Sequence, residues 1–390
     1  VLQTITSINH QRIFGTDVLS RIDIANQGRL LELQRTILND LDSICEQFQL
    51  GKDITKLSIP VIISGNSTMQ HLLQKLSCES LGSFPFTPVD ISMHSYKNMT
   101  ILPGISTYVG ADIVSGIVAC GIDQKEEVSL LVDLGTNGEM VIGNKDRLLV
   151  TSTAAGPAFE GGDISCGMRA TDGAIEACTI DKETMEPSYH VIGEDGQKPI
   201  GLCGSGIIDV IAELFRTGII NPKGKFIREG RRVRHDAYGM GSYVLAFEEE
   251  AGSVKDVEIN EVDIDNFIRA KGAIFSAIRT MLSSLDFDVE MIDDVYVAGG
   301  IGSGINMENA VRIGMFPDIP MEKFHYIGNS SLSGAYTMLL SRDAERKCYE
   351  LASNMTYLEL SAVPTYMDEF VACCFIPHTD TTLFPSCVQE

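Results

Sequence analysis

The chain has 390 residues, of which 44% are hydrophobic and 21% charged, and its formal net charge is −23. A chain of this length can form two or three domains with hydrophobic cores. The sequence contains neither an apolar run of about 18 residues, which a membrane span needs, nor a recognisable secretory signal. Nucleic-acid binding usually needs a basic surface, which this acidic composition does not offer. We therefore expect a folded cytoplasmic protein that binds neither membranes nor nucleic acids.

Neither the cysteines nor the one basic run of the chain indicates a specific function. The 10 cysteines are scattered, and none of them forms a C-x-x-C pair. Irregular spacing in a chain of this length does not indicate a disulfide framework, so we expect free thiols. The one basic run is FIREGRRVRH at 226–235. Its simple interpretation is a solvated loop or hairpin, and the alternative is a docking patch for an acidic partner.

Two segments of the chain follow the same plan of elements. A helical stretch at 30–48 precedes an apolar strand, a glycine turn and a helix at 56–73. A helical stretch at 266–285 precedes the same series at 293–311. The recurrence predicts one α/β unit that occurs twice.

The N-terminal segment extends this repeat. Residues 1–22 align with 147–168, so that Gly15 meets Gly161 and both segments begin with residues typical of a strand. The strand at 147–153 follows a hairpin, and the repeat implies a matching hairpin before Val1. We therefore expect the natural protein to extend N-terminally and to carry a second phosphate loop there.

Residues 108–121 (YVGADIVSGIVACG) predict a helix with a smooth face, because Ala111, Ser115 and Ala119 recur every four positions. Asp112 lies beside that face. An acid on such a helix is commonly an exposed or capping group. If the helix crosses a domain interface, Asp112 is instead a candidate for orienting an attacking water. Residues 328–341 predict another helix of the same kind.

Two apolar runs at 128–135 and 139–143 flank the sequence Gly135-Thr136-Asn137-Gly138. Asn-Gly between apolar runs is a strong hairpin signal, and a plain turn is the simple interpretation. The functional interpretation is that exposed N–H groups and Thr136 hold phosphate, because glycine lets the backbone approach a ligand. Asp133, at the end of the first run, would then face a metal ion.

Residues 201–218 (GLCGSGIIDVIAELFRTG) predict a helix from the spacing of their apolar residues. We expect Ser205 to cap the N-terminus and Gly218 to end the helix. Gly204, Ser205 and Gly206 expose N–H groups where the helix dipole favours an anion. A glycine-rich turn with an ordinary cap explains the same residues.

Residues 295–306 (VYVAGGIGSGIN) read as a strand followed by a glycine loop and a helix. A Rossmann site is a poor interpretation, because no acidic residue about 20 positions later ends a clear second strand. Gly299, Gly300 and Gly302 would let a flat ring lie against the backbone. Nucleoside binding and a packed turn both remain open.

Together, the repeat, the Asp-Gly-Thr hairpin, the double-glycine loop and the small-residue helices resemble the acetate/sugar kinase, heat-shock ATPase and actin superfamily. The chain is most similar to its branch of reductive activators of corrinoid proteins. The resemblance covers nearly the whole chain and is carried by FGTDVLSRI (14–22), GNSTMQHLL (65–73), PGISTYVGADIVSGI (103–117), DLGTNGEMVIGN (133–144), STAAGPAFEGGDISCGMRA (152–170), GLCGSGIIDVIAELF (201–215), VAGGIGSGIN (297–306), GNSSLSGA (328–335) and IPHTDTTLFPS (376–386).

This resemblance implies an α/β fold of the duplicated, actin-like (ribonuclease H-like) type, with two ATPase lobes. Residues 1–125 would form the first lobe without its N-terminal phosphate hairpin. Residues 126–342 would form the second lobe, with the second phosphate motif and the adenosine motif. Residues 343–390 would pack back on the lobes.

The resemblance also implies an activity: ATP-dependent return of a Co(II) corrinoid to Co(I) on a methyltransferase partner, by a cytoplasmic homodimer. ATP and Mg²⁺ would bind this chain, and a [2Fe–2S] cluster would belong to an N-terminal domain that the sequence lacks. Motif matching assigns Mg²⁺ to Asp133 through water and the water-orienting acid to Asp112. The phosphate residues would be Gly135, Thr136, Asn137 and Gly138, and the residues flanking the nucleoside Gly204, Ser205, Gly206, Gly299, Gly300 and Gly302.

Two other functions fit the same motifs. A small-molecule kinase of the superfamily would place a general base next to the γ-phosphate. A non-catalytic scaffold would bind nucleotide without turnover.

Overall fold

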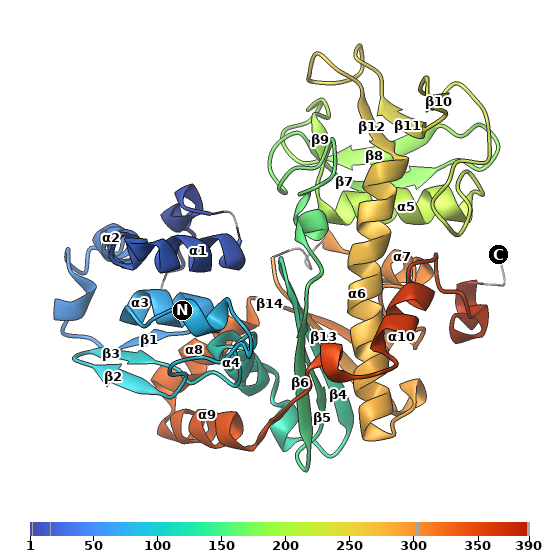
Figure 1. The fold of residues 1–390 in the computed structure, drawn as a ribbon. Helices are drawn as coiled ribbons and strands as arrows, with labels where there is room; N and C mark the ends of the chain where they lie inside the picture. The colour runs from blue at the N-terminus through green and yellow to red at the C-terminus, as the bar shows by residue number, and fades with distance from the viewer. Residues whose placement is uncertain (2, 16, 301–303, 388–390) are drawn as a thin grey trace. The chain divides into compact units, whose positions relative to one another are not determined.

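The computed structural model describes residues 1–390 except 2, 16, 301–303 and 388–390 (Figure 1). The chain forms two compact units, and neither is continuous in sequence. Unit 1 comprises Val1–Glu126, Gly143–Val150 and Asn329–Tyr357. Unit 2 comprises Glu127–Ile142, Thr151–Gly328 and Leu358–Glu390. The resemblance implies that residues 329–342 belong to the second lobe, whereas in the structure this stretch belongs to unit 1.

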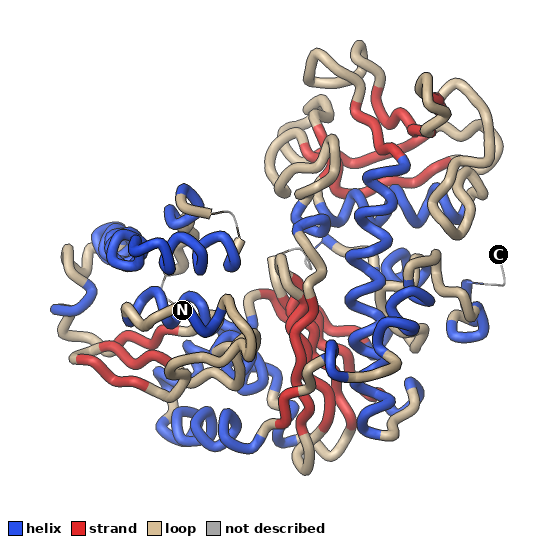
Figure 2. The backbone as a smooth tube through the Cα atoms, viewed as in Figure 1, coloured by secondary structure: helices blue, strands red, loops and turns tan. Residues whose placement is uncertain are grey.

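Unit 1 combines a small sheet with helices (Figure 2). The sheet has the order β1-β3-β2, in which β1 is parallel and β2 antiparallel to β3. Its strands are β1 (Val61–Ile63), β2 (His94–Tyr96) and β3 (Met99–Ile101). Its helices are α1 (Val18–Ile24), α2 (Leu30–Gln47), α3 (Ser67–Gln74), α4 (Ala111–Cys120), α8 (Ser330–Leu340) and α9 (Arg342–Asn354).

The two small-residue helices pack against each other within unit 1. A side chain at Gly334 of α8 would overlap the carbonyl oxygen of Ser115 on α4, so the helix backbones approach closely there. Ser64, at the end of β1, connects both helices, since its Oγ lies 2.7 Å from Ser115 Oγ and 2.9 Å from Ser331 Oγ. The smooth face predicted for 108–121 therefore serves helix packing.

The start of the chain departs from the predicted repeat. Residues 3–9 form no strand, and the first regular element is a 3-10 turn at His10–Ile13. The aligned acids also differ, because Asp17 caps α1 by accepting from Ser20 N at 2.8 Å, whereas Asp163 has a left-handed φ of 58°. The expected strand at the N-terminus is thus wrong for the described residues.

The central sheet has six strands in the order β14-β13-β4-β5-β6-β15, with β5 and β6 running across the division between the units. Strand β13 is parallel to β4 and to β14. The remaining strands of unit 2 form two three-stranded sheets, β8-β7-β9 and β10-β11-β12. The strands are β4 (Val128–Leu134), β5 (Gly138–Gly143), β6 (Leu148–Thr153), β7 (Ala174–Ile180), β8 (Pro187–Val191), β9 (Gly201–Leu202), β10 (Val233–His235), β11 (Gly241–Ala246), β12 (Val257–Asn260), β13 (Ile292–Ala298), β14 (Phe324–Gly328) and β15 (Thr356–Tyr357).

The long helix α6 (Glu261–Leu285) organises the core of unit 2. Its N-terminus has a capping box, in which the Asn260 side chain accepts from Asp263 N and the Asp263 side chain accepts from Asn260 N. Most of its residues are buried, and Ile274 packs against Gly138 at the start of β5. The other helices of this unit are α5 (Gly204–Arg216), α7 (Met307–Arg312) and α10 (Tyr366–Cys373).

The C-terminal segment is shared between the units, since residues up to Tyr357 belong to unit 1 and the rest to unit 2. In unit 2 it is held by Lys271 of α6, which is fully buried and donates hydrogen bonds to the carbonyl oxygens of Phe375 and Pro377. Burial lowers the pKa of this lysine to about 7.

The basic run at 226–235 forms part of the hairpin of β10 and β11, as its simple interpretation predicts. Arg232 is buried and pairs with Glu186 at 2.6 Å, and Arg234 pairs with Asp256 at 2.5 Å. Much of its charge is therefore neutralised within the unit.

No helix in the described part of the chain has the length and apolar composition that crossing a bilayer requires.

Candidate functional site

The predicted phosphate hairpin connects β4 to β5. Residues 135–137 form the bend, and Gly135 N donates to Asn137 O at 3.0 Å. Asp133 is the second-last residue of β4 and is partly buried. The apolar strands and the short connection between them were both predictable from the sequence.

The glycine loop after β13 lies beside this hairpin. Strand β13 is parallel to β4, with Ala298 opposite Asp133, so the two chain segments leave the sheet at the same edge. Gly299 has a φ of 104°, and a side chain there would overlap the Leu134 carbonyl oxygen. The structure thus brings together the predicted metal residue and the first glycine of the adenosine motif.

Helix α5 begins close to the same loop. A Cβ atom at Gly304 would lie 3.1 Å from Ser205 Oγ, in the first turn of α5. The expected cap is wrong, because Cys203 is the N-cap residue and Ser205 Oγ lies 3.3 Å from Cys203 Sγ. The expected helix end is confirmed, since Gly218 follows the last turn with a left-handed φ of 67°.

The predicted glycines divide into two groups. A side chain at Gly138 would overlap Ile274, and one at Gly206 would overlap the Ile175 carbonyl oxygen, so packing alone requires glycine at both positions. Gly300 has open space around it among the described residues. Gly302 lies outside the described residues.

The structure adds Glu160, which the motifs did not single out. Thr136 Oγ1 donates to Glu160 Oε1 at 3.1 Å, and Thr136 O accepts from Gly156 N at 2.9 Å. The loop at 154–162 therefore lies against the phosphate hairpin. A signal was present in the sequence, because glycines on both sides of Phe159-Glu160 indicate a tightly turned loop.

Asp112 lies in the first turn of α4, in unit 1. It is partly buried, and its Oδ1 accepts from Ile113 N at 3.0 Å. The other predicted site residues belong to unit 2. The role of Asp112 as the water-orienting acid stays a prediction.

A cavity of about 430 Å³ lies between α5, β7 and α7 in unit 2. Asp209 lies in the wall of this cavity and connects β7 to α7, because its carboxylate accepts hydrogen bonds from Cys178 N at 3.2 Å and from Asn309 Nδ2 at 2.7 Å. Burial raises the pKa of this carboxyl. The volume is within the range of small-molecule sites. The lining residues are Ala177, Cys178, Thr179, Asp209, Glu213, Arg216, Asn306, Glu308, Asn309 and Arg312.

A larger cavity of about 840 Å³ lies in unit 2, beside the C-terminal end of α6. Its charged lining residues are Arg279 and five acids: Asp286, Asp288, Glu290, Asp318 and Glu369. The C-terminal end of a helix adds negative potential to these carboxylates. Despite its size, this cavity does not suit an anionic ligand such as a nucleotide.

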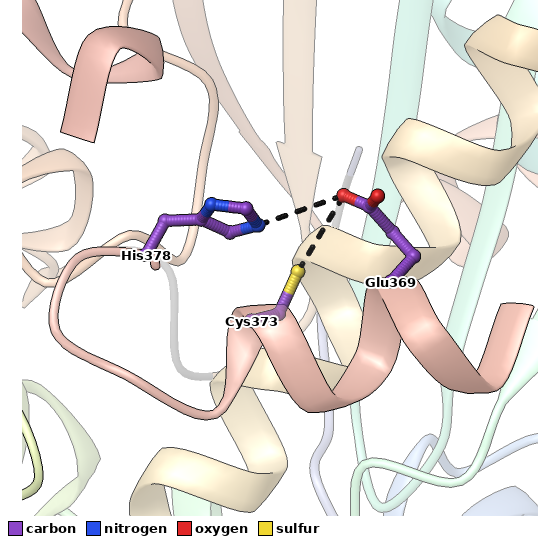
Figure 3. Close-up of side chains that lie close together, drawn as sticks. All are labelled: Glu369, Cys373 and His378. Carbon is purple, nitrogen blue, oxygen red and sulfur yellow. Dashed lines mark hydrogen bonds and ion pairs between the residues drawn. The ribbon is translucent and has the colours of Figure 1, made fainter. Parts of the chain in front are cut away.

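One group of potential metal ligands lies beside this cavity and consists of Glu369, Cys373 and His378 (Figure 3). Their potential ligand atoms lie within 4.8 Å of one another. Glu369 Oε1 lies 3.6 Å from His378 Nε2 and 3.9 Å from Cys373 Sγ. It also pairs with Arg279 Nε at 3.0 Å. The nearby His378 ring and then Arg279 lower the pKa of the Glu369 carboxyl, against the opposing effect of burial.

The hydrogen bonds of this cluster do not suit a metal ion. His378 Nδ1 accepts from Asp380 N at 2.9 Å, so the proton of a neutral ring is on Nε2 and its lone pair is unavailable to a metal. Burial raises the pKa of the Cys373 thiol to about 12, which disfavours the thiolate that binds metals. The cluster therefore ties the C-terminal segment to α10 and α6.

Comparison with protein families gives two matches that cover nearly the whole chain. Residues 127–388 match the C-terminal domain of RACo, described as the ASKHA domain, and residues 1–125 match the RACo middle region. The α/β fold of actin-like ATPase type, predicted from the sequence, is confirmed.

Individual relatives agree. The chain is 34% identical to the corrinoid activation enzyme RamQ of Eubacterium limosum over 389 residues, which cover 93% of this chain and 64% of the relative. It is 28% identical to the [Co(II) methylated amine-specific corrinoid protein] reductase of Methanosarcina barkeri, with coverage of 70% and 50%. A solved reductive activator for corrinoid, iron–sulfur protein superposes with a TM-score of 0.86 at 41% identity, over 99% of this chain and 64% of that one. The chain thus spans half to two thirds of the length of these relatives.

Proposed function

Because the chain belongs to the RACo family of reductive activators of corrinoid proteins, we propose that it is the ATP-binding and ATP-hydrolysing part of such an activator. The reaction it serves is the return of a Co(II) corrinoid to Co(I) on a methyltransferase partner. The observation that carries the proposal is the pairing of β4 with β13, which sets Asp133 beside the glycine loop of an ASKHA domain.

In this proposal, the phosphates lie against the hairpin loop of Gly135, Thr136, Asn137 and Gly138, in which the Gly135 N–H already donates to Asn137 O. Gly204, Ser205 and Gly206 at the start of α5 add the positive end of a helix dipole. The nucleoside lies along Gly299, Gly300 and Gly302, toward the cavity of about 430 Å³ between α5 and α7.

The residues present fit a hard divalent cation. Asp133 offers a carboxylate and Thr136 a hydroxyl, and oxygen donors of this kind suit Mg²⁺ together with phosphate oxygens. When bound, Mg²⁺ would neutralise the phosphate charge that develops during hydrolysis. The chain's own part is to hold the phosphates and to orient the attacking water, for which Asp112 is the candidate.

Reduction of Co(II) to Co(I) takes one electron, and ATP hydrolysis supplies the drive for that uphill transfer. Iron–sulfur clusters are held by several cysteine thiolates, usually four, whereas the group of potential metal ligands found among the described residues contains one cysteine, Cys373. We therefore assign no electron-carrying step to this chain. A corrinoid protein partner, a homodimeric state and a cytoplasmic location complete the proposal.

The direct test combines the chain, a Co(II) corrinoid protein and a low-potential chemical reductant, and follows cobalt by its absorbance. We expect Co(I) to accumulate faster when Mg²⁺ and ATP are present than when ATP is withheld. Equal rates in the two conditions would contradict the proposal.

The same samples distinguish the two alternative functions. Transfer of labelled phosphate from ATP to an acid or a sugar would favour the small-molecule kinase. Binding of ATP without any turnover would favour the scaffold.

A further inference from the structure

Glu160, a carboxylate to which the sequence motifs assign no role in the site, contacts the Thr136 side chain. The Thr136 hydroxyl donates a hydrogen bond to Glu160 Oε1 at 3.1 Å, over a separation of 24 residues. The Glu160 residue is exposed, so this carboxylate is accessible to a ligand. The contact places a negative side chain beside the phosphate loop, in addition to Asp133, which lies three positions before the threonine.

The position of Glu160 is fixed by its surroundings. It ends a short 3-10 turn, Pro157–Glu160, which begins with a proline. Its neighbour Phe159 is fully buried and contacts the Phe267 ring edge-to-face, with centroids 5.4 Å apart. Gly156, just before the turn, donates its N–H to the Thr136 carbonyl at 2.9 Å. The backbone thus holds the carboxylate in place against the hairpin.

The direction of this hydrogen bond determines what the hydroxyl can do. An ionised carboxylate only accepts hydrogen bonds, so Thr136 is the donor and its oxygen lone pairs are available to a ligand. A hydroxyl in this state suits a cation better than it suits a phosphate oxygen, which requires a donor. Mg²⁺ takes oxygen ligands of this kind beside phosphates.

Charge leads to the same conclusion. Free ATP is a polyanion, which the carboxylates of Asp133 and Glu160 repel. In the magnesium complex, two positive charges lie beside these carboxylates and offset that repulsion. One pair of unit charges at contact distance changes a binding constant about fivefold even in bulk water, and more near a protein surface.

We propose that Glu160 acts through the Thr136 hydroxyl as a positioning residue that makes the site select the metal complex of the nucleotide over the free polyphosphate. The inference rests on the nucleotide binding of the proposed function. Without this carboxylate, the N–H groups of the loop can still bind phosphate. The site would then no longer discriminate between Mg-ATP and free ATP.

The experiment is isothermal titration calorimetry of the chain with ATP, once with excess Mg²⁺ and once with EDTA. In the wild type we expect ATP to bind more tightly with Mg²⁺ than with EDTA. The selectivity ratio is the dissociation constant in EDTA divided by that in Mg²⁺, and we expect Glu160→Gln to narrow this ratio, that is, to lower it, about tenfold. Thr136→Val gives the same narrowing, whereas Thr136→Ser keeps the hydroxyl and the wild-type ratio. Glu183→Gln, at an exposed position of the same unit, leaves the ratio unchanged.

The outcomes separate this inference from the proposed function. An unchanged ratio in Glu160→Gln overturns the inference and leaves nucleotide binding standing. Narrowing in Glu160→Gln without narrowing in Thr136→Val overturns the route through the hydroxyl. A wild-type chain that binds ATP in neither condition overturns the proposed function itself. Circular dichroism of each variant establishes that it is folded before its ratio is compared.

Discussion

Single residues differ in how far the sequence reveals their role. The position of Asp133 at the end of a strand was predictable from the apolar run before Gly-Thr-Asn-Gly, whereas its role as a metal residue stays a prediction. Glu160 was not, since its contact with Thr136 depends on how a loop 24 residues away folds back. Lys271 was not either, because nothing in a helical pattern shows that a lysine turns into the core.

Asp133→Asn tests the metal residue with little change of shape. We expect the dissociation constant of Mg-ATP to rise about tenfold or more, because the carboxylate charge that favours the cation is lost. Calorimetric titration measures it, and Asp146→Asn, at an exposed position in the turn after β5, serves as the control. Equal affinity in Asp133→Asn and the wild type would place the cation elsewhere.

Lys271 makes the stability of unit 2 depend on pH. Its pKa is about 7 in the folded chain, against 10.5 for an unperturbed lysine. Below pH 7 both states bind the proton and the cost of burying the charge is present in full. Between pH 7 and 10.5 only the unfolded state binds it, so the free energy of unfolding rises with pH.

Comparison with Lys271→Met isolates this effect. From pH 7 to 8.5 we expect the wild type to gain about 1.6 kcal/mol relative to that variant. Urea denaturation at each pH measures the difference, and Lys182→Met, at an exposed position, provides the reference. Parallel pH profiles for the wild type and Lys271→Met would show that the buried lysine does not titrate in this range.

Most elements were predictable from their apolar periodicity. The strands β4, β5, β6 and β13 and the helices α2, α5 and α6 lie where the pattern places them, with ends that differ by a few residues. The predictions that were wrong concern positions where local interactions differ from what the sequence pattern indicates. Residues 3–9 have a strand-like composition but form no strand. Ser205 does not cap α5, because Cys203 is the N-cap residue of that helix.

The hydrogen bonds at the N-terminus of α6 provide a test of how this helix is stabilised. Asp263 accepts from Ser165 N at 2.8 Å and from Ser165 Oγ at 2.9 Å, besides its bond in the capping box. Asp263→Ala should therefore lower the free energy of unfolding by about 2–3 kcal/mol, because the buried carboxylate accepts three hydrogen bonds and bonds to a charged group are among the stronger ones. Asn260→Ala should cost about 1 kcal/mol, the usual value for a cap. Chemical denaturation would contradict this account if Asn260→Ala proved the more harmful change.

The packing of α4 on α8 offers another test. A methyl group at Gly334 would overlap the Ser115 carbonyl oxygen, so Gly334→Ala should destabilise the chain by about 2 kcal/mol through overpacking. Ser333→Ala, at the exposed neighbouring position of the same helix, is the matched control. A thermal unfolding midpoint that falls equally in both variants would show that close approach of the helices is not the cause.

For the whole molecule, the sequence indicated two lobes but not how the chain divides between them. Residues 143–150 and 329–357 join unit 1 although they follow segments of unit 2. Periodicity cannot show this, because it reports that α8 has a small-residue face and not that α4 provides the complementary one. The closeness of Asp133 and Gly299 was predictable once the two strands were recognised as parallel neighbours, since both residues lie at the ends of those strands.

The proposed function can be tested by measuring ATP hydrolysis by the chain with and without a Co(II) corrinoid protein. We expect phosphate release that requires Mg²⁺, increases when the Co(II) corrinoid protein is added, and is lost in Asp133→Asn. Phosphate release that the corrinoid protein leaves unchanged, or that Asp133→Asn retains in full, would contradict it.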